Sequence, residues 1–375
     1  MQRVEVEALT ETHEPLQSLV KTLQSDCALE AASDTKYSQG LKSVGLAPGA
    51  APEFAPTAVD ASMPITEVAL ANLRRYLSAW HLHEPGARLG DNPDELHDLR
   101  VAGRRLDAVL RQFRSSLPAS FLRIRPTLKK VLRALGDVRD LDVALLDLET
   151  FSRELPKSDR ESVEPLKQHL VSECGRARAR MLSVLDSVSV QRNLQKLTSL
   201  LTAHSAALEQ SSQKFALNVA PELIRRRYRK VRKGADLLTL DSSIEAYHKV
   251  RGQVKKLRYA LETVAVLYGK PADQMLRAMR RWQEELGVQQ DAEVASRRLK
   301  TLASAPHKGI SSETLFLMGR LAEHYASAAV RARRACPKGY RKVRARWKRL
   351  RTKFEGSARN DTPKLPDSGP HDRMV

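Results

Sequence analysis

Cysteine is scarce in this sequence, and its few residues form neither a disulfide framework nor a zinc-binding pattern. The 375 residues include three cysteines, Cys27, Cys174 and Cys336, which are far apart and in no CxxC spacing. No run of 18 uncharged apolar residues occurs, so no membrane insertion is expected. The amino-terminal residues lack the basic start and apolar segment of a secretory signal. We therefore expect a reducing, cytoplasmic compartment.

Aromatic residues are also few, at 5%, whereas basic residues are abundant. The chain has 64 Lys and Arg against 44 Asp and Glu, a net charge of +20. Residues 1–63 hold four basic and nine acidic residues, and residues 361–375 hold two and three, so residues 64–360 carry +26. A field of this sign destabilises the compact state unless a polyanion neutralises it. The sequence thus predicts a negatively charged partner.

From Pro64 onward, apolar residues recur at helical spacing, with few β-branched runs or turn dipeptides. This texture predicts an all-α fold. Residues 1–63 are acidic and contain a Pro/Ala/Gly stretch, which is typical of a disordered extension. Residues 356–375 are polar and contain proline, and we predict a disordered tail there.

Two segments of the helical region recur at one offset. His97–Leu106 matches His248–Leu257, and Leu135–Val143, which begins with an LG pair, matches Leu286–Val294, both 151 residues apart. Such a repeat predicts two helical bundles of about four long helices each, related by a pseudo-twofold axis. If their basic faces meet, they line a central groove or pore.

A third match sets the expected limits of the two bundles. The motif YRKVR begins at Tyr228 and again at Tyr340, an offset of only 112. If each motif belongs to the last helix of its bundle, the first repeat spans residues 64–236 and the second spans 241–355.

One predicted helix in each repeat carries a cationic stripe beside its apolar stripe. Asn92 and Pro93 are a typical helix start. Helical-wheel positions at about 100° per residue separate an apolar face from a basic face in both repeats. The apolar faces comprise Leu96, Leu99, Leu106, Leu110 and Phe113, and Val250, Leu257, Leu261 and Val264. The basic faces comprise His97, Arg100, Arg104 and Arg111, and His248, Arg251 and Lys255.

The helix before each LG pair adds basic residues. These are Arg125, Lys129, Lys130 and Arg133 in the first repeat, and Arg277, Arg280 and Arg281 in the second. Arg180 and Arg331 are also related by the offset of 151, so we include both in the predicted site. The run from Arg225 to Lys233 is equally consistent with an ordinary solvated face.

Asp140 and Asp142 follow the first LG pair, and Asp291 and Glu293 follow the second. One interpretation is that these carboxylates orient neighbouring Arg and Lys side chains. Paired carboxylates also bind Mg²⁺, which leaves a metal or catalytic role open. No Gly-rich phosphate loop accompanies them, and we predict neither a catalytic residue nor a bound cofactor or metal.

These motifs together resemble the CHAD domain, the conserved histidine α-helical domain. The resemblance lies in HDLRVAGRRLDAVLRQF, LGDVRDLDVALLDL, YHKVRGQVKKLRYALE and LGVQQDAEVASRRL, and spans residues 64–355. It implies two four-helix bundles around a basic channel that binds inorganic polyphosphate, and association with polyphosphate or polyhydroxyalkanoate granules and their proteins. The family's basic positions fall on His97, Arg100, Arg104, Arg105, Lys129, Arg139, His248, Arg251, Lys255, Lys256, Arg258 and Arg280.

The sequence departs from that pattern at Gln290, in place of Arg139, and at Glu293, in place of Asp142. We expect the second repeat to bind less strongly for this reason. We predict a non-catalytic polyphosphate-binding protein, since Arg forks and Lys charges suit a ligand without bases. A nucleic-acid-binding protein is the alternative that the charge allows, and a Mg²⁺-dependent polyphosphate-processing enzyme using Asp140 and Asp142 is a third.

Overall fold

The chain divides into two compact units, Met1–Ala51 and Pro52–Val375. The computed structural model describes residues 14–27, 54, 57–203, 214–304 and 311–360. In the first unit, α1 (Glu14–Asp26) is a helix where the sequence predicts disorder. Its leucines, three to four residues apart, explain this difference. Most of the remaining extension lies outside the described residues.

Every regular element that the structure describes in the second unit is helical, which confirms the predicted fold class. The α-helices are α3 (Ile65–Leu89), α4 (Pro93–Gln112), α5 (Ala119–Leu122), α6 (Arg125–Glu154), α7 (Lys157–Arg160), α8 (Glu164–Asp186), α9 (Val188–Ala203), α10 (Ala216–Ala235), α11 (Ile244–Glu262), α12 (Lys270–Ser304) and α13 (Ser312–Asn360). Short 3₁₀ turns, η1 (Glu161–Val163) and η2 (Ala265–Leu267), join some of them. α13 continues through Asn360 into the predicted tail, and residues 361–375 lie outside the described part.

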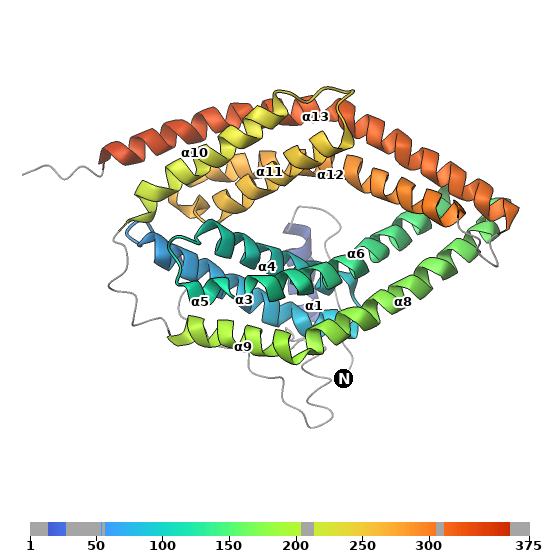
Figure 1. Cartoon of the computed structure of the whole chain (residues 1–375), viewed down its shortest axis with the longest axis horizontal. Helices are drawn as coiled ribbons and strands as arrows, with labels where there is room; N and C mark the ends of the chain where they lie inside the picture. The colour runs from blue at the N-terminus through green and yellow to red at the C-terminus, as the bar shows by residue number, and fades with distance from the viewer. Residues whose placement is uncertain (1–13, 28–53, 55–56, 204–213, 305–310, 361–375) are drawn as a thin grey trace, which may run out of the picture. The chain divides into compact units, whose positions relative to one another are not determined.

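The helices of this unit pack in two groups (Figure 1). In one group α4 packs between α3 and α6, and α6 packs on α8, with α9 against α3, α6 and α8. In the other, α11 packs between α10 and α12, and α13 lies along α12. The groups meet where α4 contacts α11, and again where η1 contacts α13.

α10 packs mainly with the second group, although its residues fall within the predicted first repeat, 64–236. Tyr228 of α10 stacks on Trp347 of α13, with ring centroids 3.9 Å apart. The start of α10, at Ala216, lies 151 residues after the start of α3, at Ile65. α10 is thus the sequence counterpart of α3. The YRKVR motifs of α10 and α13 are therefore similar in sequence, as basic helix surfaces often are, but the two helices are not counterparts in the repeat.

The helices that carry the cationic stripes begin where the sequence predicts. Asn92 caps α4, and its side-chain oxygen accepts a hydrogen bond from the Asp94 amide at 2.9 Å. Ser243 caps α11 in the same way, through the Ala246 amide at 3.3 Å. The predicted apolar stripes of both helices are buried. Burial of these stripes fixes the rotation of α4 and α11, and therefore the direction of their basic faces.

The starts of α3 and α10 are joined by two reciprocal main-chain hydrogen bonds. The Ile65 amide donates to the Lys214 carbonyl at 2.9 Å, and the Ala216 amide donates to the Met63 carbonyl at 3.0 Å. Ile65 and Ala216 are 151 residues apart, and so are Met63 and Lys214, so each bond is the counterpart of the other. These bonds connect the beginnings of the two helix groups.

One hydrophobic core continues through both groups, from the α3 and α4 residues to those of α12 and α13. No described helix combines the length and the apolar character needed to cross a lipid bilayer.

Candidate functional site

The basic faces of α4 and α11 lie together where these helices meet. We call Arg100, Arg104, Arg251 and Lys255 the basic cluster. Burial, followed by the charges of Arg104, Arg251 and Arg100, lowers the pKa of Lys255 to about 6. Burial also lowers the pKa of Arg100 to about 10 and that of Arg104 in the same direction. Cations from both helices are thus half-buried within electrostatic reach of one another.

Two arginines of the cluster lie against the LG motifs of α6 and α12, at ordinary van der Waals distance from where a Cβ atom would be. A Cβ atom at Gly136 would lie 3.8 Å from Arg100 Nε. At the equivalent position Gly287, a Cβ atom would lie 3.4 Å from Arg251 Nη2. Arg251 also donates to Gln290 Oε1 at 2.9 Å. Gln290, the departure from the first repeat, therefore orients Arg251 as a neutral acceptor.

Few carboxylates oppose these charges. Asp140 lies 3.7 Å from Arg100, and its equivalent Asp291 has a pKa raised by burial and by Asp140 but lowered by Arg251. Asp142, by contrast, accepts a hydrogen bond from Cys174 Sγ at 3.5 Å. Asp140 and Asp142 therefore point to different partners and do not converge as a metal-binding pair. The described residues contain no group of three His, Cys, Asp or Glu side chains suited to a metal ion.

A buried carboxylate joins the two helix groups beside the cluster. Glu262 lies 2.6 Å from Arg258, 3.4 Å from Arg105 and 3.8 Å from Arg280. Arg105 also lies over the Tyr76 ring. Three residues of the predicted site, Arg105, Arg258 and Arg280, thus already share an internal counterion.

A second set of cations lies around Arg111 and includes residues that the sequence analysis left out. The charges of Arg111, Arg227 and Lys230 lower the pKa of Lys256, after the larger effect of burial. Arg227 and Lys230 belong to α10, and Arg227 is the 151-offset counterpart of Tyr76. Because Tyr76 is not basic, the repeat carried no signal for this position, and only the packing of α10 on α11 identifies it.

The two predicted histidines lie at the exposed starts of the basic faces. His97 has a pKa lowered by burial and then by the charge of Arg139. His248 is exposed near the start of α11. The charge of Arg139 also helps to lower the pKa of Arg100, so α6 places this cation close to the cluster.

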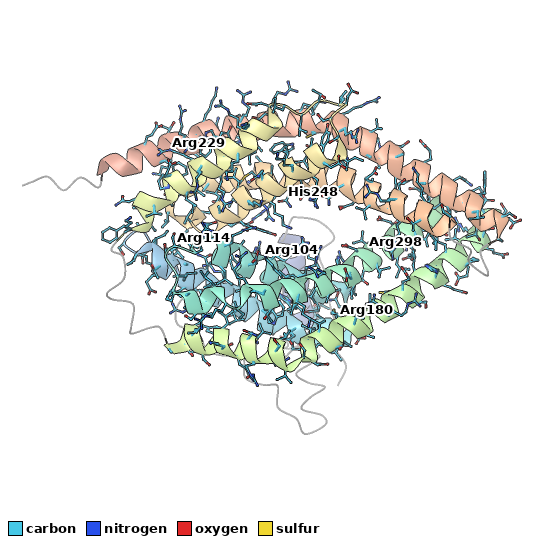
Figure 2. All side chains as sticks on the ribbon, viewed as in Figure 1. Arg104, Arg114, Arg180, Arg229, His248 and Arg298 are labelled. Atoms are coloured by element: carbon cyan, nitrogen blue, oxygen red, sulfur yellow. The ribbon has the colours of Figure 1, made fainter. Side chains whose placement is uncertain are left out.

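Other predicted residues are not brought to the cluster by any hydrogen bond or ion pair of the described chain. These are Lys129, Lys130 and Arg133 on α6, Arg180 on α8 and Arg331 on α13, all of which are exposed. Figure 2 shows Arg180 on α8, apart from Arg104. Arg281 is also elsewhere, in a pocket between α12 and α13. Similar charge and helical spacing do not distinguish these surfaces from the cluster.

One basic residue near this region has a structural role. Arg178 of α8 donates to the carbonyls of Ala87 and Arg88 at 3.1 and 2.7 Å. These carbonyls belong to the last turn of α3, which ends at Gly90 in the left-handed conformation with φ 82°. Arg178 therefore caps α3.

The fold and the cluster define an all-helical protein in which two helix groups bring half-buried cations together. The chain belongs to the CHAD domain family, whose model matches residues 71–300. The resemblance seen in the sequence motifs is thereby confirmed.

Two solved structures share this fold. The chain is similar to the CHAD domain from the plant Ricinus communis, with 26% identity, coverage of 77% of this chain and 96% of that chain, and a TM-score of 0.61. It is also similar in fold to PptA from Streptomyces chartreusis, with 19% identity, coverage of 74% and 99%, and a TM-score of 0.58. No curated protein matches the chain.

Proposed function

We propose that this protein binds inorganic polyphosphate, without processing it, in a basic channel between two duplicated helix bundles. The observation that carries the proposal is the basic cluster, in which equivalent cations of α4 and α11 face one another with few counterions. Family membership supports the same ligand, because polyphosphate association is what membership in the CHAD family implies.

Contacts between equivalent residues support a pseudo-twofold arrangement of the bundles. Gln112 donates to Thr263 Oγ1 at 3.1 Å, and these residues are 151 apart. The reciprocal main-chain bonds between the starts of α3 and α10 obey the same offset. Contacts of this kind arise when a repeat meets its own copy across a twofold axis. In this arrangement the channel lies between the equivalent basic faces.

The chemistry of the cluster suits a flexible chain of phosphates. Each Arg offers a planar fork to phosphate oxygens, and Lys255 offers a point charge. The described aromatic rings near the cluster, such as Tyr259, lie beneath Lys255 and Arg258 and leave no open platform for bases. Polyphosphate is for this reason preferred over a nucleic acid.

The divergence of Asp140 and Asp142 supports a binding role over catalysis, because a two-carboxylate Mg²⁺ site needs both side chains at one point. We further propose that polyphosphate binding brings the protein to polyphosphate or polyhydroxyalkanoate granules in the cytoplasm, where granule proteins are its neighbours.

The test is a titration of long-chain polyphosphate into a variant with Arg104→Ala and Arg251→Ala. We expect affinity to fall at least about a hundredfold, because two charge-assisted contacts of about 1.5–3 kcal/mol each are lost. The matched control, Lys129→Ala with Lys130→Ala, removes the same charge from an exposed surface of α6 and should change affinity less than about threefold.

Equal losses in the two variants would reject the cluster as the site. Displacement of polyphosphate by duplex DNA at equal charge concentration would favour nucleic-acid binding. Release of orthophosphate in the presence of Mg²⁺, lost in an Asp140→Ala variant, would establish an enzyme.

A further inference from the structure

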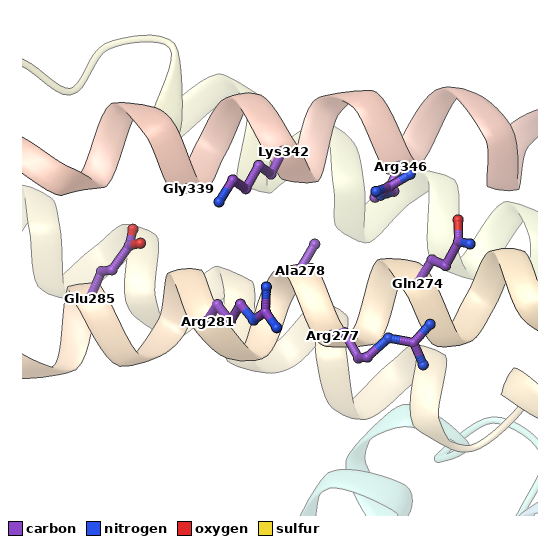
Figure 3. A pocket seen from close by; sticks show the side chains of 8 residues that line it. All are labelled: Gln274, Arg277, Ala278, Arg281, Glu285, Gly339, Lys342 and Arg346. Carbon is purple, nitrogen blue, oxygen red and sulfur yellow. The ribbon is translucent and has the colours of Figure 1, made fainter. Parts of the chain in front are cut away.

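A second cationic site lies between α12 and α13, on a different face of α12 from the basic cluster. The pocket has a volume of about 330 Å³. Its charged lining is Arg277, Arg281 and Glu285 of α12, and Lys342 and Arg346 of α13. In Figure 3, Glu285 and Gln274 of α12 point toward α13, whereas the Arg277 side chain lies at the opposite edge of α12.

The face of α12 toward the basic cluster is made by other residues. Arg280 reaches Glu262, Gln283 accepts from Arg258 at 3.0 Å, and Gln290 accepts from Arg251. Arg281 follows Arg280 directly but is rotated from it by about 100°, which turns it toward α13. The pocket therefore does not belong to the α4–α11 site.

The cations of the pocket are spaced to hold more than one phosphate group. Arg277 and Arg281 are four residues apart on α12, and Lys342 and Arg346 are four residues apart on α13. None of the four forms an ion pair or side-chain hydrogen bond with any described residue. Four like charges around one cavity repel one another, and a bound oligophosphate would reduce that repulsion.

One end of the pocket is different, because it presents an acceptor. The Oε2 atom of Glu285 is buried and has no hydrogen-bond partner among the described residues. Burial raises the pKa of this carboxyl, and Lys342 partly opposes the rise. Gly339 provides the space, since a Cβ atom there would lie 2.3 Å from Glu285 Oε2. Since Oε2 lies buried against Gly339, a ligand hydroxyl or amine at this end would donate to the other carboxylate oxygen, Oε1.

We propose that the α12–α13 pocket binds a short organic oligophosphate that carries a hydrogen-bond donor, of the chemistry of a nucleoside triphosphate. The phosphates lie between Arg277, Arg281, Lys342 and Arg346, and the donor faces Glu285. The volume is within the range of about 300–1,000 Å³ that is usual for small-molecule sites. The 151-offset counterparts of Arg277 and Glu285 are Pro126 and Ala134, so this site belongs to the second helix group alone.

The experiment measures ATP and tripolyphosphate binding by calorimetry, without divalent metal, in the full chain and three double variants. Arg281→Ala with Lys342→Ala removes two pocket cations that are exposed, so the fold is expected to persist, which circular dichroism checks. Lys348→Ala with Arg349→Ala removes the same charge from α13 outside the pocket. Arg104→Ala with Arg251→Ala disables the basic cluster.

We expect the pocket variant to lose at least about tenfold in ATP affinity, as two charge-assisted contacts are removed. The α13 control and the cluster variant should stay within about twofold for ATP. Long-chain polyphosphate should show the opposite pattern, weak in the cluster variant and retained in the pocket variant. If the basic cluster did not bind polyphosphate, the ATP affinities of the full chain and of the pocket variant would still differ as expected.

A single substitution tests the donor. The full chain should bind ATP more tightly than tripolyphosphate, and Glu285→Gln should raise tripolyphosphate affinity and reduce this preference, because a repelling carboxylate is removed. Tighter binding of tripolyphosphate by the unaltered chain would overturn the donor assignment. The absence of ATP binding at millimolar concentration, or an equal loss in the pocket and α13 variants, would overturn the site.

Discussion

Lys255 makes polyphosphate binding dependent on pH in a direction that the structure determines. Burial and the charges of Arg104, Arg251 and Arg100 lower its pKa to about 6. In the free protein at pH 7, only about one molecule in eleven keeps this proton. Phosphate oxygens placed beside the amine favour its charged form and raise the pKa again. Binding near pH 7 should therefore take up about 0.9 proton.

The affinity follows from the same linkage. Above pH 6 the free lysine is progressively neutral, so each further pH unit weakens binding about tenfold until the pKa of the complex is reached. Calorimetry with long-chain polyphosphate, whose internal phosphates stay ionised in this range, should give an affinity nearly tenfold lower at about pH 8 than at about pH 7.

The matched variant is Lys255→Met, which keeps the length of the side chain and removes the amine. Its affinity should be weaker at pH 7 and nearly constant from pH 7 to pH 8. The unfolded chain holds this proton up to the ordinary pKa of 10.5 and the folded chain does not. Stability of the unaltered protein should therefore rise with pH between about 6 and 10, and the variant should lack this contribution.

Two results would refute this reasoning. An affinity that is the same at pH 7 and pH 8 would show that Lys255 stays charged in the free protein. A pH slope that persists in Lys255→Met would assign the proton to another group.

Two further predictions concern the residues that hold the site in place. Arg178→Ala should lower the free energy of unfolding by about 1–3 kcal/mol in urea denaturation, because partly buried carbonyls of α3 lose their donor. The control, Arg176→Ala, removes an exposed side chain of the same helix and should change this free energy little. Equal effects of the two substitutions would contradict the capping role. Glu262→Gln should lower the free energy of unfolding by about 3 kcal/mol, measured by thermal unfolding, since Arg105 and Arg258 lose their counterion. The same substitution should tighten polyphosphate binding. Weaker binding would show instead that Glu262 orients the site.

Periodicity and self-similarity predicted the all-α fold class and the basic faces of α4 and α11. The apolar stripes of α4 and α11 leave one direction for the basic stripes, so Arg104 and Lys255 could be placed on equivalent faces from the sequence alone. The offset of 151 also identified Asp140 and Asp291, which lie within electrostatic reach of each other.

The remaining site residues could not be predicted because charge does not reveal which neighbour a helix face meets. Arg280 and Arg281 are adjacent in sequence, yet one reaches Glu262 and the other lines the pocket against α13. α12 packs against α11 and α13, so both basic faces are consistent with its apolar pattern. The role of Arg178 depends on the α3 carbonyls that it caps, which no pattern within its own helix indicates.

The paired bonds at the starts of α3 and α10 use only peptide atoms. Side-chain replacement at Ile65 or Ala216 leaves both donors intact, and among the common amino acids only proline would remove one. These two hydrogen bonds therefore do not depend on which side chains stand at these positions, and the side chains of the two helix groups can differ without breaking them. Arg111 and Glu262, which are 151 residues apart, can therefore differ in charge without affecting these main-chain bonds.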